Sequence, residues 1–254
     1  MTARFGATSL SARAEGPPEE EQLNKKTLSV GLFVALAVLS AVAAWGQGIP
    51  ALKAAYDTAV RKASLAPNDY AANWQAAQAA RKYGDQMVKD EAPDWKNLAR
   101  LAAKDGMKYG EIAFKLNDRG IEGWYWYGLC VGTYADCVSI ITALAEGLKG
   151  KTQQGFEMAY KSDKLYDNGG PMLALGRFWQ TIPGIAGQDR KKAEQLFNEY
   201  ITLLGKSASP NSDVWYFRGQ LYKDTSRAVE ARTDLQKAAS MGNKDAAKLL
   251  ATMK

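Results

Sequence analysis

The sequence predicts an all-α protein in which pairs of helices stack into a solenoid, and three observations lead to this prediction. From Pro50 onward the helix formers Ala, Lys, Leu, Glu and Gln dominate. No stretch alternates apolar and polar residues along a β-branched run, as a half-buried strand would. Small and large residues recur in several units, and Gly, Pro or Asn closes each unit.

The N-terminal region differs from the rest of the chain. Residues 1–24 hold a Gly-Pro-Pro step and three consecutive Glu, so we expect a disordered leader. Residues 27–45 carry no charge and follow Lys25 and Lys26. We expect residues 25–46 to be a hydrophobic helix, either a cleaved signal peptide or a transmembrane anchor, with a long buried core helix as the weaker alternative. Because the positive charges come first, the rest of the chain is expected to be periplasmic, secreted or tethered to the inner membrane.

Residues 50–254 are expected to form a domain of tetratricopeptide-like (TPR-like) helix pairs. In such a pair, small residues let the two helices approach and large residues fill the gap. In chain order, the first helices are marked by Trp74 and Ala77, by Trp124, Tyr127, Gly128 and Val131, by Met172, Leu175, Gly176 and Trp179, and by Trp215, Gly219 and Tyr222. The second helices are marked by the stretch 95–116, by Ala193, Phe197 and Tyr200, and by Ala231, Leu235 and Ala238. Breaks are expected at residues 67–68, 117–118, 168–171 and 209–210.

The later repeats are longer than the about 34 residues of a regular TPR, which predicts insertions. The largest insertion is Asp136–Thr152, where apolar residues at helical spacing predict an additional helix. The apolar stripe of this helix is Cys137, Ile141, Leu144 and Leu148. We expect the stripe to face the core, with a partner- or self-association face as the alternative.

The absence of histidine narrows the chemistry that this chain can perform. The chain contains no His and two Cys. This excludes imidazole acid–base catalysis, Ser-His and Cys-His nucleophile pairs, and closed metal sites built on His or on four Cys. No other catalytic constellation emerges, so we expect a protein that is not an enzyme and needs no cofactor or metal. The net charge of +6 is spread along the chain, which argues against nucleic-acid binding.

Two short motifs have ordinary structural explanations. The run Ala145–Thr152 matches a relaxed P-loop pattern, but a helix and not a strand is expected before it, so we do not expect nucleotide binding. Cys130 and Cys137 would lie about 10.5 Å apart along one continuous helix, too far for a disulfide. We expect two small buried apolar residues, and a bend at Gly132-Thr133 that brings the thiols together is the alternative.

The candidate ligand- or partner-binding residues come from the first helices and the insertion: Tyr125, Trp126, Tyr134, Asp136, Arg177 and Trp179. Trp124 and Tyr127 occupy core positions of their helix. Tyr125 and Trp126 point elsewhere, and we expect them to line a groove or to pack on the inserted helix. Arg177 would clamp a carboxylate, or alternatively form an internal ion pair with Asp136 or Asp163. Tyr134 and Asp136 carry the same two alternatives.

Two segments of the chain, 124–152 and 159–184, share a distinctive set of residues. These are Trp126-Tyr127-Gly128, Gly132, Tyr134-Ala135-Asp136, Lys151, Gly169-Gly170-Pro171, Gly176-Arg177 and Pro183. On these residues the chain resembles the TatT family, the periplasmic TPR component associated with some TRAP transporters. The layout is also similar to that of the regulator of microtubule dynamics TPR proteins. The resemblance implies a curved or ring-like α-solenoid that works with a substrate-binding protein.

The expected function is that of an exported TPR adaptor. It would bind a protein partner, either a substrate-binding protein or a membrane complex, and also a small apolar or carboxylate ligand. The alternative is a structural or assembly subunit of a larger membrane complex, anchored through residues 27–45 if they are not cleaved. Self-association into a homo-oligomer stays open.

Overall fold

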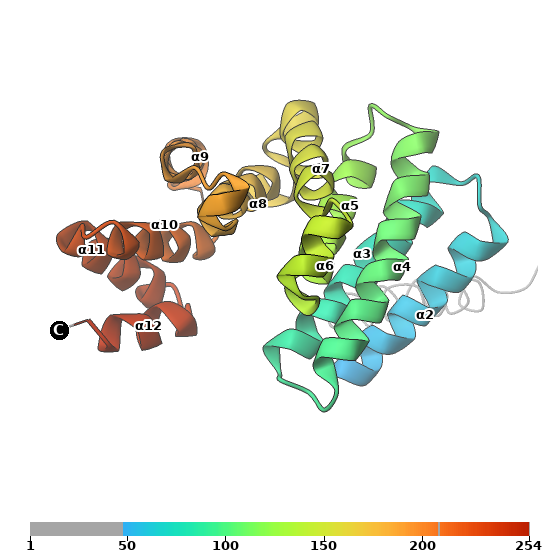
Figure 1. The fold of residues 1–254 in the computed structure, drawn as a ribbon, viewed down its shortest axis with the longest axis horizontal. Coiled ribbons are helices and arrows are strands. Elements are labelled where there is room, and N and C mark those ends of the chain that lie inside the picture. Colours follow the sequence, from blue (N-terminus) through green and yellow to red (C-terminus); the bar gives the residue numbers. More distant parts are fainter. Residues whose placement is uncertain (1–47, 208, 254) are drawn as a thin grey trace, which may run out of the picture. The chain divides into compact units, whose positions relative to one another are not determined.

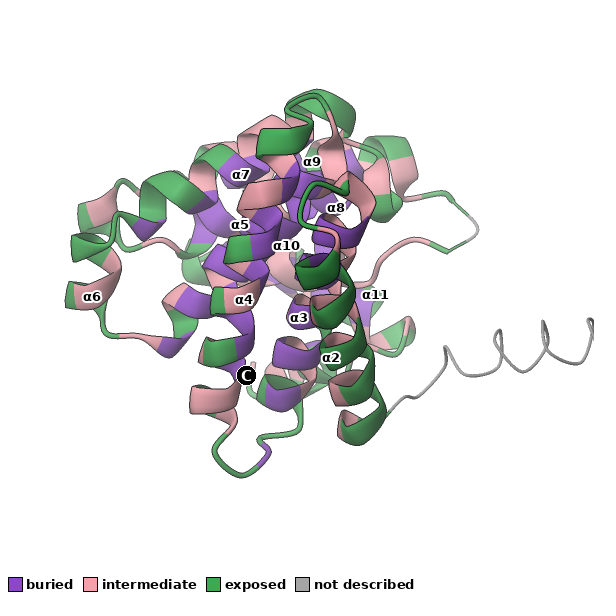
Figure 2. Cartoon of the chain, turned by 90° about the vertical axis from the view of Figure 1, so that its right-hand side faces the viewer, coloured by how far each residue is buried: buried purple, intermediate pink, exposed green. Residues whose placement is uncertain are grey.

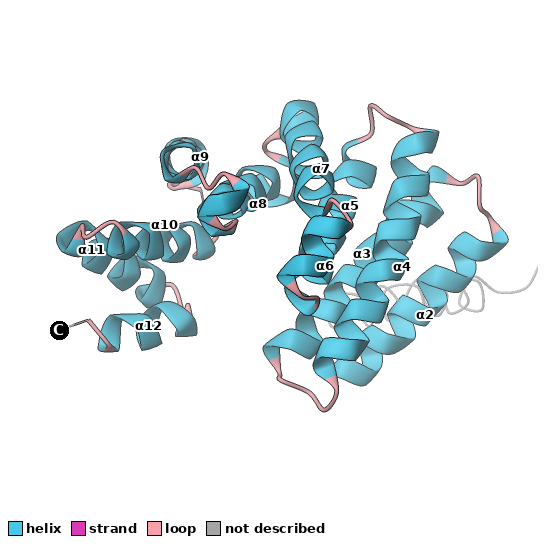
Figure 3. Ribbon diagram, viewed as in Figure 1, coloured by secondary structure: helices cyan, strands magenta, loops and turns pink. Residues whose placement is uncertain are grey.

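The structure is a computed structural model that describes residues 48–207 and 209–253. Over these residues the chain has eleven α-helices, one 3-10 turn and no strand (Figure 3), which confirms the all-α prediction there. The helices are α2 (Ile49–Leu65), α3 (Tyr70–Lys89), α4 (Trp95–Leu116), α5 (Ile121–Cys137), α6 (Ile140–Ala145), α7 (Leu148–Asp163), α8 (Tyr166–Thr181), η1 (Gly184–Ala186), α9 (Arg190–Leu204), α10 (Asp213–Asp224), α11 (Ala228–Ser240) and α12 (Lys244–Ala251).

The chain divides into two units, Met1–Gly48 and Ile49–Lys254, and all of these helices belong to the second. The leader 1–24 and the hydrophobic segment 25–46 lie outside the described residues. None of the helices that the structure describes combines the length and the apolarity needed to cross a bilayer.

Side-chain caps fix where several helices begin. Asp69 Oδ1 accepts a hydrogen bond of 3.0 Å from Ala72 N at the start of α3, directly after the predicted break at residues 67–68. Asp189 Oδ1 accepts one of 2.9 Å from Lys192 N at the start of α9. A carboxylate at this position satisfies a backbone N–H that has no partner within the helix and stabilises the positive end of the helix dipole.

The helices pack as four pairs, α3 with α4, α5 with α7, α8 with α9, and α10 with α11, and successive pairs contact each other (Figure 1). Close approach within the pairs depends on glycine. A Cβ atom on Gly128 would lie 2.8 Å from Phe156 Cδ1, and one on Gly219 would lie 2.8 Å from Leu235 Cγ. These contacts match the predicted alternation of small and large residues, so the TPR-like pairing is confirmed.

The cores lie along the faces where the helices meet, and Figure 2 shows the buried positions concentrated there. Phe197 and Tyr200, predicted for the second helix of the third pair, are fully buried. Trp124 is buried as predicted, and its ring stacks on Phe114 with centroids 3.9 Å apart. Tyr127 is buried on the same helix and meets Phe114 edge-on. Large side chains therefore fill the space between helices that the small residues bring together.

The insertion is shorter than the helix predicted over Asp136–Thr152. α5 continues to Cys137, α6 covers Ile140–Ala145, and α7 begins at Leu148. Gly147, in the turn before α7, has a φ of 65°, which favours glycine and ends the preceding helix. The inserted helix is therefore α6 alone. The P-loop-like run forms this turn and the beginning of α7, with a helix before it.

The division into three helices also separates the predicted apolar stripe. Cys137 and Leu148 are buried, as expected for core residues. Ile141 and Leu144 lie on α6 and are 76% and 59% exposed. The prediction of a continuous core stripe is therefore wrong for α6, because the turns on both sides of it point its apolar residues away from the core.

The break predicted at residues 168–171 falls at a left-handed turn that opens α8. Asp167, Asn168 and Gly169 have φ values of 49°, 55° and 78°. The Tyr125 hydroxyl donates to Asp167 Oδ2 at 3.0 Å, which ties this turn to α5. Regular helix follows, with Pro171 in its first turn, where a missing N–H costs nothing.

Candidate functional site

A groove of about 460 Å³ lies where α5, α6 and α7 meet α8 and η1. It is termed here the α5–α8 groove. Asp136 of α5, Leu144 of α6, Lys149 of α7, Arg177 of α8 and Ile185 of η1 all line it. Because α5 and α7 belong to one helix pair and α8 to the next, the groove exists only where successive pairs stack.

Arg177 is half-buried in this groove and bonded to neutral groups. Its Nη1 donates to Gln180 Oε1 at 3.1 Å and to Gln220 Oε1 at 2.7 Å, and its guanidinium lies 4.7 Å from the centre of the Phe217 ring. Across the described part of the chain, no carboxylate forms an ion pair with it. The alternative of an ion pair with Asp136 or Asp163 is therefore wrong. Burial lowers the pKa of Arg177, and Tyr216 and the carboxylates of Asp136, Asp224 and Asp213 offset part of that fall without forming an ion pair with it.

Asp136 and Arg81 also bring charges to the lining of this groove. Nε of Arg81, on α3, lies 2.8 Å from Asp85 Oδ2. The Nη1 of the same side chain donates to Leu129 O at 3.1 Å and to the Thr133 hydroxyl. Asp136 is exposed, yet the surrounding protein desolvates its carboxylate enough to raise its pKa, and Arg81 and Arg177 offset part of that rise. Arg81 is thus paired with an internal carboxylate, whereas the hydrogen-bond partners of Arg177 are neutral amides.

The outer walls of the groove are apolar and open to solvent. Ile140 and Leu144 of α6 are 55% and 59% exposed, and Ile185 of η1 is 92% exposed. Phe178 and Phe156 line the groove from α8 and α7 and are buried. Exposed apolar side chains gathered around a cavity are typical of a binding site.

Two other candidate residues, Tyr125 and Trp126, are buried and do not line this groove. The Tyr125 ring meets Tyr166 edge-on with centroids 5.4 Å apart, and Trp126 Nε1 donates to Tyr166 OH at 3.3 Å. Packing against α6 is not observed for either residue. The reason is the position of α5, which contacts α3, α4, α7 and α8, so the faces that carry Tyr125 and Trp126 are covered.

Tyr134 and Trp179 are also held by internal contacts. The Tyr134 hydroxyl donates to Glu146 Oε1 at 3.1 Å, and its side chain is buried. Trp179 is buried, with Lys192 Nζ 4.1 Å from the centre of its ring. Of the six candidate residues, the structure therefore brings Asp136 and Arg177 together in one groove and places the other four in the packed interior.

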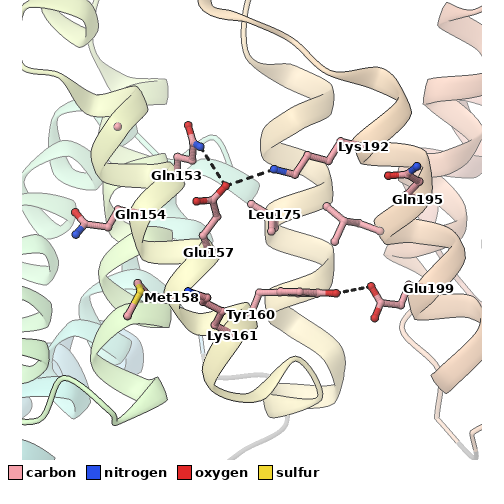
Figure 4. Close-up of a pocket in the computed structure, with 12 residues that line it drawn as sticks. Gln153, Gln154, Glu157, Met158, Tyr160, Lys161, Leu175, Lys192, Gln195 and Glu199 are labelled. Atoms are coloured by element: carbon pink, nitrogen blue, oxygen red, sulfur yellow. Dashed lines mark hydrogen bonds and ion pairs between the residues drawn. The ribbon is translucent and has the colours of Figure 1, made fainter.

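A second groove, of about 660 Å³, lies between α7 and the pair α8–α9 (Figure 4). It is termed here the polar groove. Most of its lining side chains carry amides or charges, namely Gln153, Gln154, Glu157, Lys161, Lys192, Gln195 and Glu199. Leu175 and Leu196 form its apolar floor, and neither Tyr125 nor Trp126 lines it.

Hydrogen bonds connect the two sides of the polar groove. Glu157 Oε1 accepts from Gln153 Nε2 at 3.1 Å and from Lys192 Nζ at 3.4 Å (Figure 4). The Tyr160 hydroxyl donates to Glu199 Oε2 at 2.7 Å, and Lys164 Nζ donates to the other oxygen of this carboxylate. Burial raises the pKa of Glu199, but these two hydrogen bonds outweigh it and hold the pKa below its ordinary value. Glu157 and Lys192 are both about 40% exposed and their pair is long, so a partner can replace it at little cost.

Several groove residues were not predicted from the sequence. Arg81 and Lys149 enter the α5–α8 groove from helices that are far apart in sequence, and no local pattern marks them. Ile185 follows the Pro183-Gly184 break. A large apolar residue in a predicted loop is the feature of the sequence that indicates an exposed binding position there. The charged and amide side chains of the polar groove lie on the second helices α7 and α9, where charged residues usually mark a solvated face.

The thiols and carboxylates offer no metal site in the described ranges. No group of Cys, Asp and Glu suited to a metal ion is found within residues 48–207 and 209–253. Cys130 and Cys137 are both buried and free, as expected for small apolar residues. Burial raises the pKa of Cys130 to about 12, so its thiol stays protonated near neutral pH.

Comparison with known proteins identifies the fold. No protein-family model and no curated protein matches this sequence. The structure is similar to that of a thermophilic TPR protein from Thermus thermophilus, with a TM-score of 0.57 over 87% of this chain and 95% of that chain, at 16% sequence identity. At this identity the likeness shows the fold alone, and the chain therefore has a TPR-like fold.

Proposed function

We propose that this protein is an adaptor that binds a protein partner through the polar groove. The observation that carries the proposal is a solvent-accessible groove between two stacked pairs of a TPR-like fold. Solenoids of this kind expose extended surfaces along their stacked repeats, and partners bind to them. A protein partner is favoured over a catalytic role because the groove offers many hydrogen-bonding groups, while its lining residues include no Ser, Thr, Cys or His.

The chemistry of the polar groove suits an extended polypeptide. Gln153, Gln154 and Gln195 each carry a donor and an acceptor, as a peptide group does, so they can pair with a partner's main chain. Glu157 and Lys192 offer one charge of each sign across the groove. Tyr160 adds a large flat surface beside them, with its hydroxyl held by Glu199. We therefore expect a partner segment with polar main-chain groups exposed and paired charges on its side chains.

The location of the adaptor is part of the proposal. We propose that residues 27–45 export the chain or tether it to the inner membrane, which places the polar groove in the periplasm. The resemblance to the TatT family supports a substrate-binding protein as the partner and a role beside a TRAP transporter. Mass spectrometry of the native N-terminus tests the export proposal. A start near Ala44 supports a cleaved signal peptide, an intact leader supports the membrane-anchored alternative, and a cytoplasmic chain would contradict both.

Site-specific photo-crosslinking in cells tests the binding surface. A photoreactive amino acid at Gln195 in the polar groove is compared with one at Lys62, an exposed position on α2 that lines neither groove. We expect a discrete crosslinked protein from position 195 and none from position 62. The same band from both positions, or none from position 195, would contradict the proposed surface.

Charge reversal provides a second test with its own fold control. Glu157→Lys should abolish the crosslink at position 195, since it places two cations across the groove. The double variant Glu157→Lys with Lys192→Glu restores the internal pair with opposite polarity. The double variant is expected to fold normally. If the partner binds through these two charges, the double variant still fails to capture it. Recovery of the crosslink in the double variant would show that the partner does not use these charges.

A further inference from the structure

We propose that the α5–α8 groove is a separate site for a small amphiphile, a monocarboxylate with an apolar chain. The carboxylate would pair with Arg177, and the chain would lie between α6 and η1. The groove volume of about 460 Å³ falls within the range of ordinary small-molecule pockets. This inference does not depend on the protein partner, because it concerns a different groove and a different class of ligand.

The state of Arg177 argues for an anion. A guanidinium that leaves water is stabilised well only by a carboxylate or phosphate that its planar fork can match. Here the side chain is half-buried and its two hydrogen-bond partners are the amides of Gln180 and Gln220. These amides orient the guanidinium without neutralising it. Lys149, at the exposed rim of the same groove, adds a second positive charge and forms no ion pair among the described residues.

The other charges argue for a single negative charge on the ligand. Arg81 is already paired with Asp85 at 2.8 Å and bonded to α5, so it contributes little net positive charge to an incoming anion. Asp136 lines the groove with a negative charge of its own. A phosphate dianion would meet this carboxylate with one free guanidinium to compensate it, and its desolvation would cost more than that of a carboxylate. A monocarboxylate fits the charges that are present.

The walls argue for an apolar chain on that carboxylate. Ile140 and Leu144 on α6 and Ile185 on η1 are among the most exposed large apolar side chains of the described residues, and all three line this one groove. They come from segments more than forty residues apart in the sequence, so their convergence is a property of the fold. A chain between them would bury apolar surface on both sides, and each added methylene should tighten binding about fourfold until the groove is filled.

Calorimetric titration with a series of linear carboxylates tests the site. Residues 49–254 form a compact unit that contains all the hydrophobic cores described above, so this unit is titrated without detergent, and the full-length chain is measured in parallel. Octanoate, decanoate and dodecanoate are used below their micellar concentrations. We expect one site per chain, an affinity that rises about fourfold per methylene, and much weaker binding of dodecanol, which lacks the charge.

Matched variants separate the head of the ligand from its chain. Arg177→Gln should weaken dodecanoate at least about tenfold and leave dodecanol unchanged, because it removes a charge-assisted contact. Arg61→Gln, at an exposed position of α2, is the control for the lost charge. Leu144→Asn should flatten the dependence on chain length, with Leu203→Asn on α9 as the control for an exposed leucine. Far-UV circular dichroism confirms that each variant is folded.

Three results would overturn the inference. One is no saturable binding of any carboxylate. Another is an equal loss of dodecanoate affinity in Arg177→Gln and Arg61→Gln. The third is equal weakening of dodecanoate and dodecanol by Arg177→Gln, which would mean that the variant distorts the groove and removes no charge-specific contact. A failure here leaves the crosslink at position 195 unaffected, so the two proposals fail independently.

Discussion

Replacing Gly155 with alanine tests whether the contact between α5 and α7 sets the geometry of the second helix pair. A Cβ atom on Gly155 would lie 2.8 Å from Gly128 Cα, 3.0 Å from Gly128 N and 3.1 Å from Trp124 O. All three are backbone atoms of α5, so no side-chain rotation can make room. The two helices must move apart along their whole contact, and the grooves on both sides of α7 must change with them.

The magnitude follows from two opposing effects. Overpacking a well-packed core costs typically about 1–3 kcal/mol and occasionally more, and a clash with backbone belongs at the upper end, about 3 kcal/mol. Alanine also gains about 1 kcal/mol over glycine in a helix interior. Gly132 of α5 provides the control, because a Cβ there meets nothing within 4 Å. We expect Gly155→Ala to lose about 2 kcal/mol net and Gly132→Ala to gain about 1 kcal/mol.

Thermal unfolding followed by far-UV circular dichroism measures both changes. For a domain of this size, 1 kcal/mol shifts Tm by about 2–4 °C, so Gly155→Ala should lower Tm by about 4–8 °C and Gly132→Ala should raise it by about 2–4 °C. The two variants share the gain in helix propensity, and the difference between them isolates the steric cost. If Gly155→Ala were as stable as Gly132→Ala, the α5–α7 contact would not be as close as described.

Three further predictions concern the charges and the thiols. Arg218 binds the buried Asp234 through two hydrogen bonds of 2.7 and 2.8 Å, so Arg218→Met should lower the free energy of unfolding by about 3–5 kcal/mol, and adding Asp234→Leu should restore most of it in denaturant titrations. Because the folded-state pKa of Glu199 is lowered, its stabilisation is complete above the ordinary glutamate pKa and disappears as the pH falls through the folded value; Glu199→Gln should therefore cost stability at about pH 7 and progressively less as the pH falls below the ordinary glutamate pKa, and a cost that does not change with pH would refute the assignment. Cys130 and Cys137 should react with a thiol reagent only after denaturation, and rapid labelling of the native protein would show that α5 opens.

Much of the fold could be predicted because its determinants are local. The turn residues at 67–68 and the helical spacing of the stretch 95–116 predict a break and a helix, and α3 and α4 begin accordingly. Gly128 and Gly219 are the small positions of a repeat, and each faces the large side chain of its partner helix. Spacing of this kind is visible in one sequence without any knowledge of what else packs nearby.

The candidate site was harder to predict because it depends on which faces other helices cover. The spacing along one helix suggests that Tyr125 and Trp126 are free to bind a ligand or partner. In the structure α5 contacts four other helices, and both side chains are buried. Ile141 and Leu144 look like core residues, but two turns separate α6 from its neighbours and leave them exposed. Arg177 stands out in the sequence as a candidate anion ligand, whereas Lys149 does not, because a charge on a second helix has no local feature that distinguishes it from a solvated one.

The α5–α8 groove has walls from two different helix pairs, and this links its occupancy to the bending of the solenoid. Any change in the angle between the α5–α7 pair and the α8–α9 pair widens or narrows the space between Leu144 and Ile185. An occupant that fits one width best would therefore favour one angle. A partner in the polar groove that favours the same angle would tighten binding of that occupant, and the occupant would tighten binding of the partner by the same factor. Since α7 forms a wall of both grooves, a movement of α7 would change both of them, and this would couple the binding of the two proposed ligands.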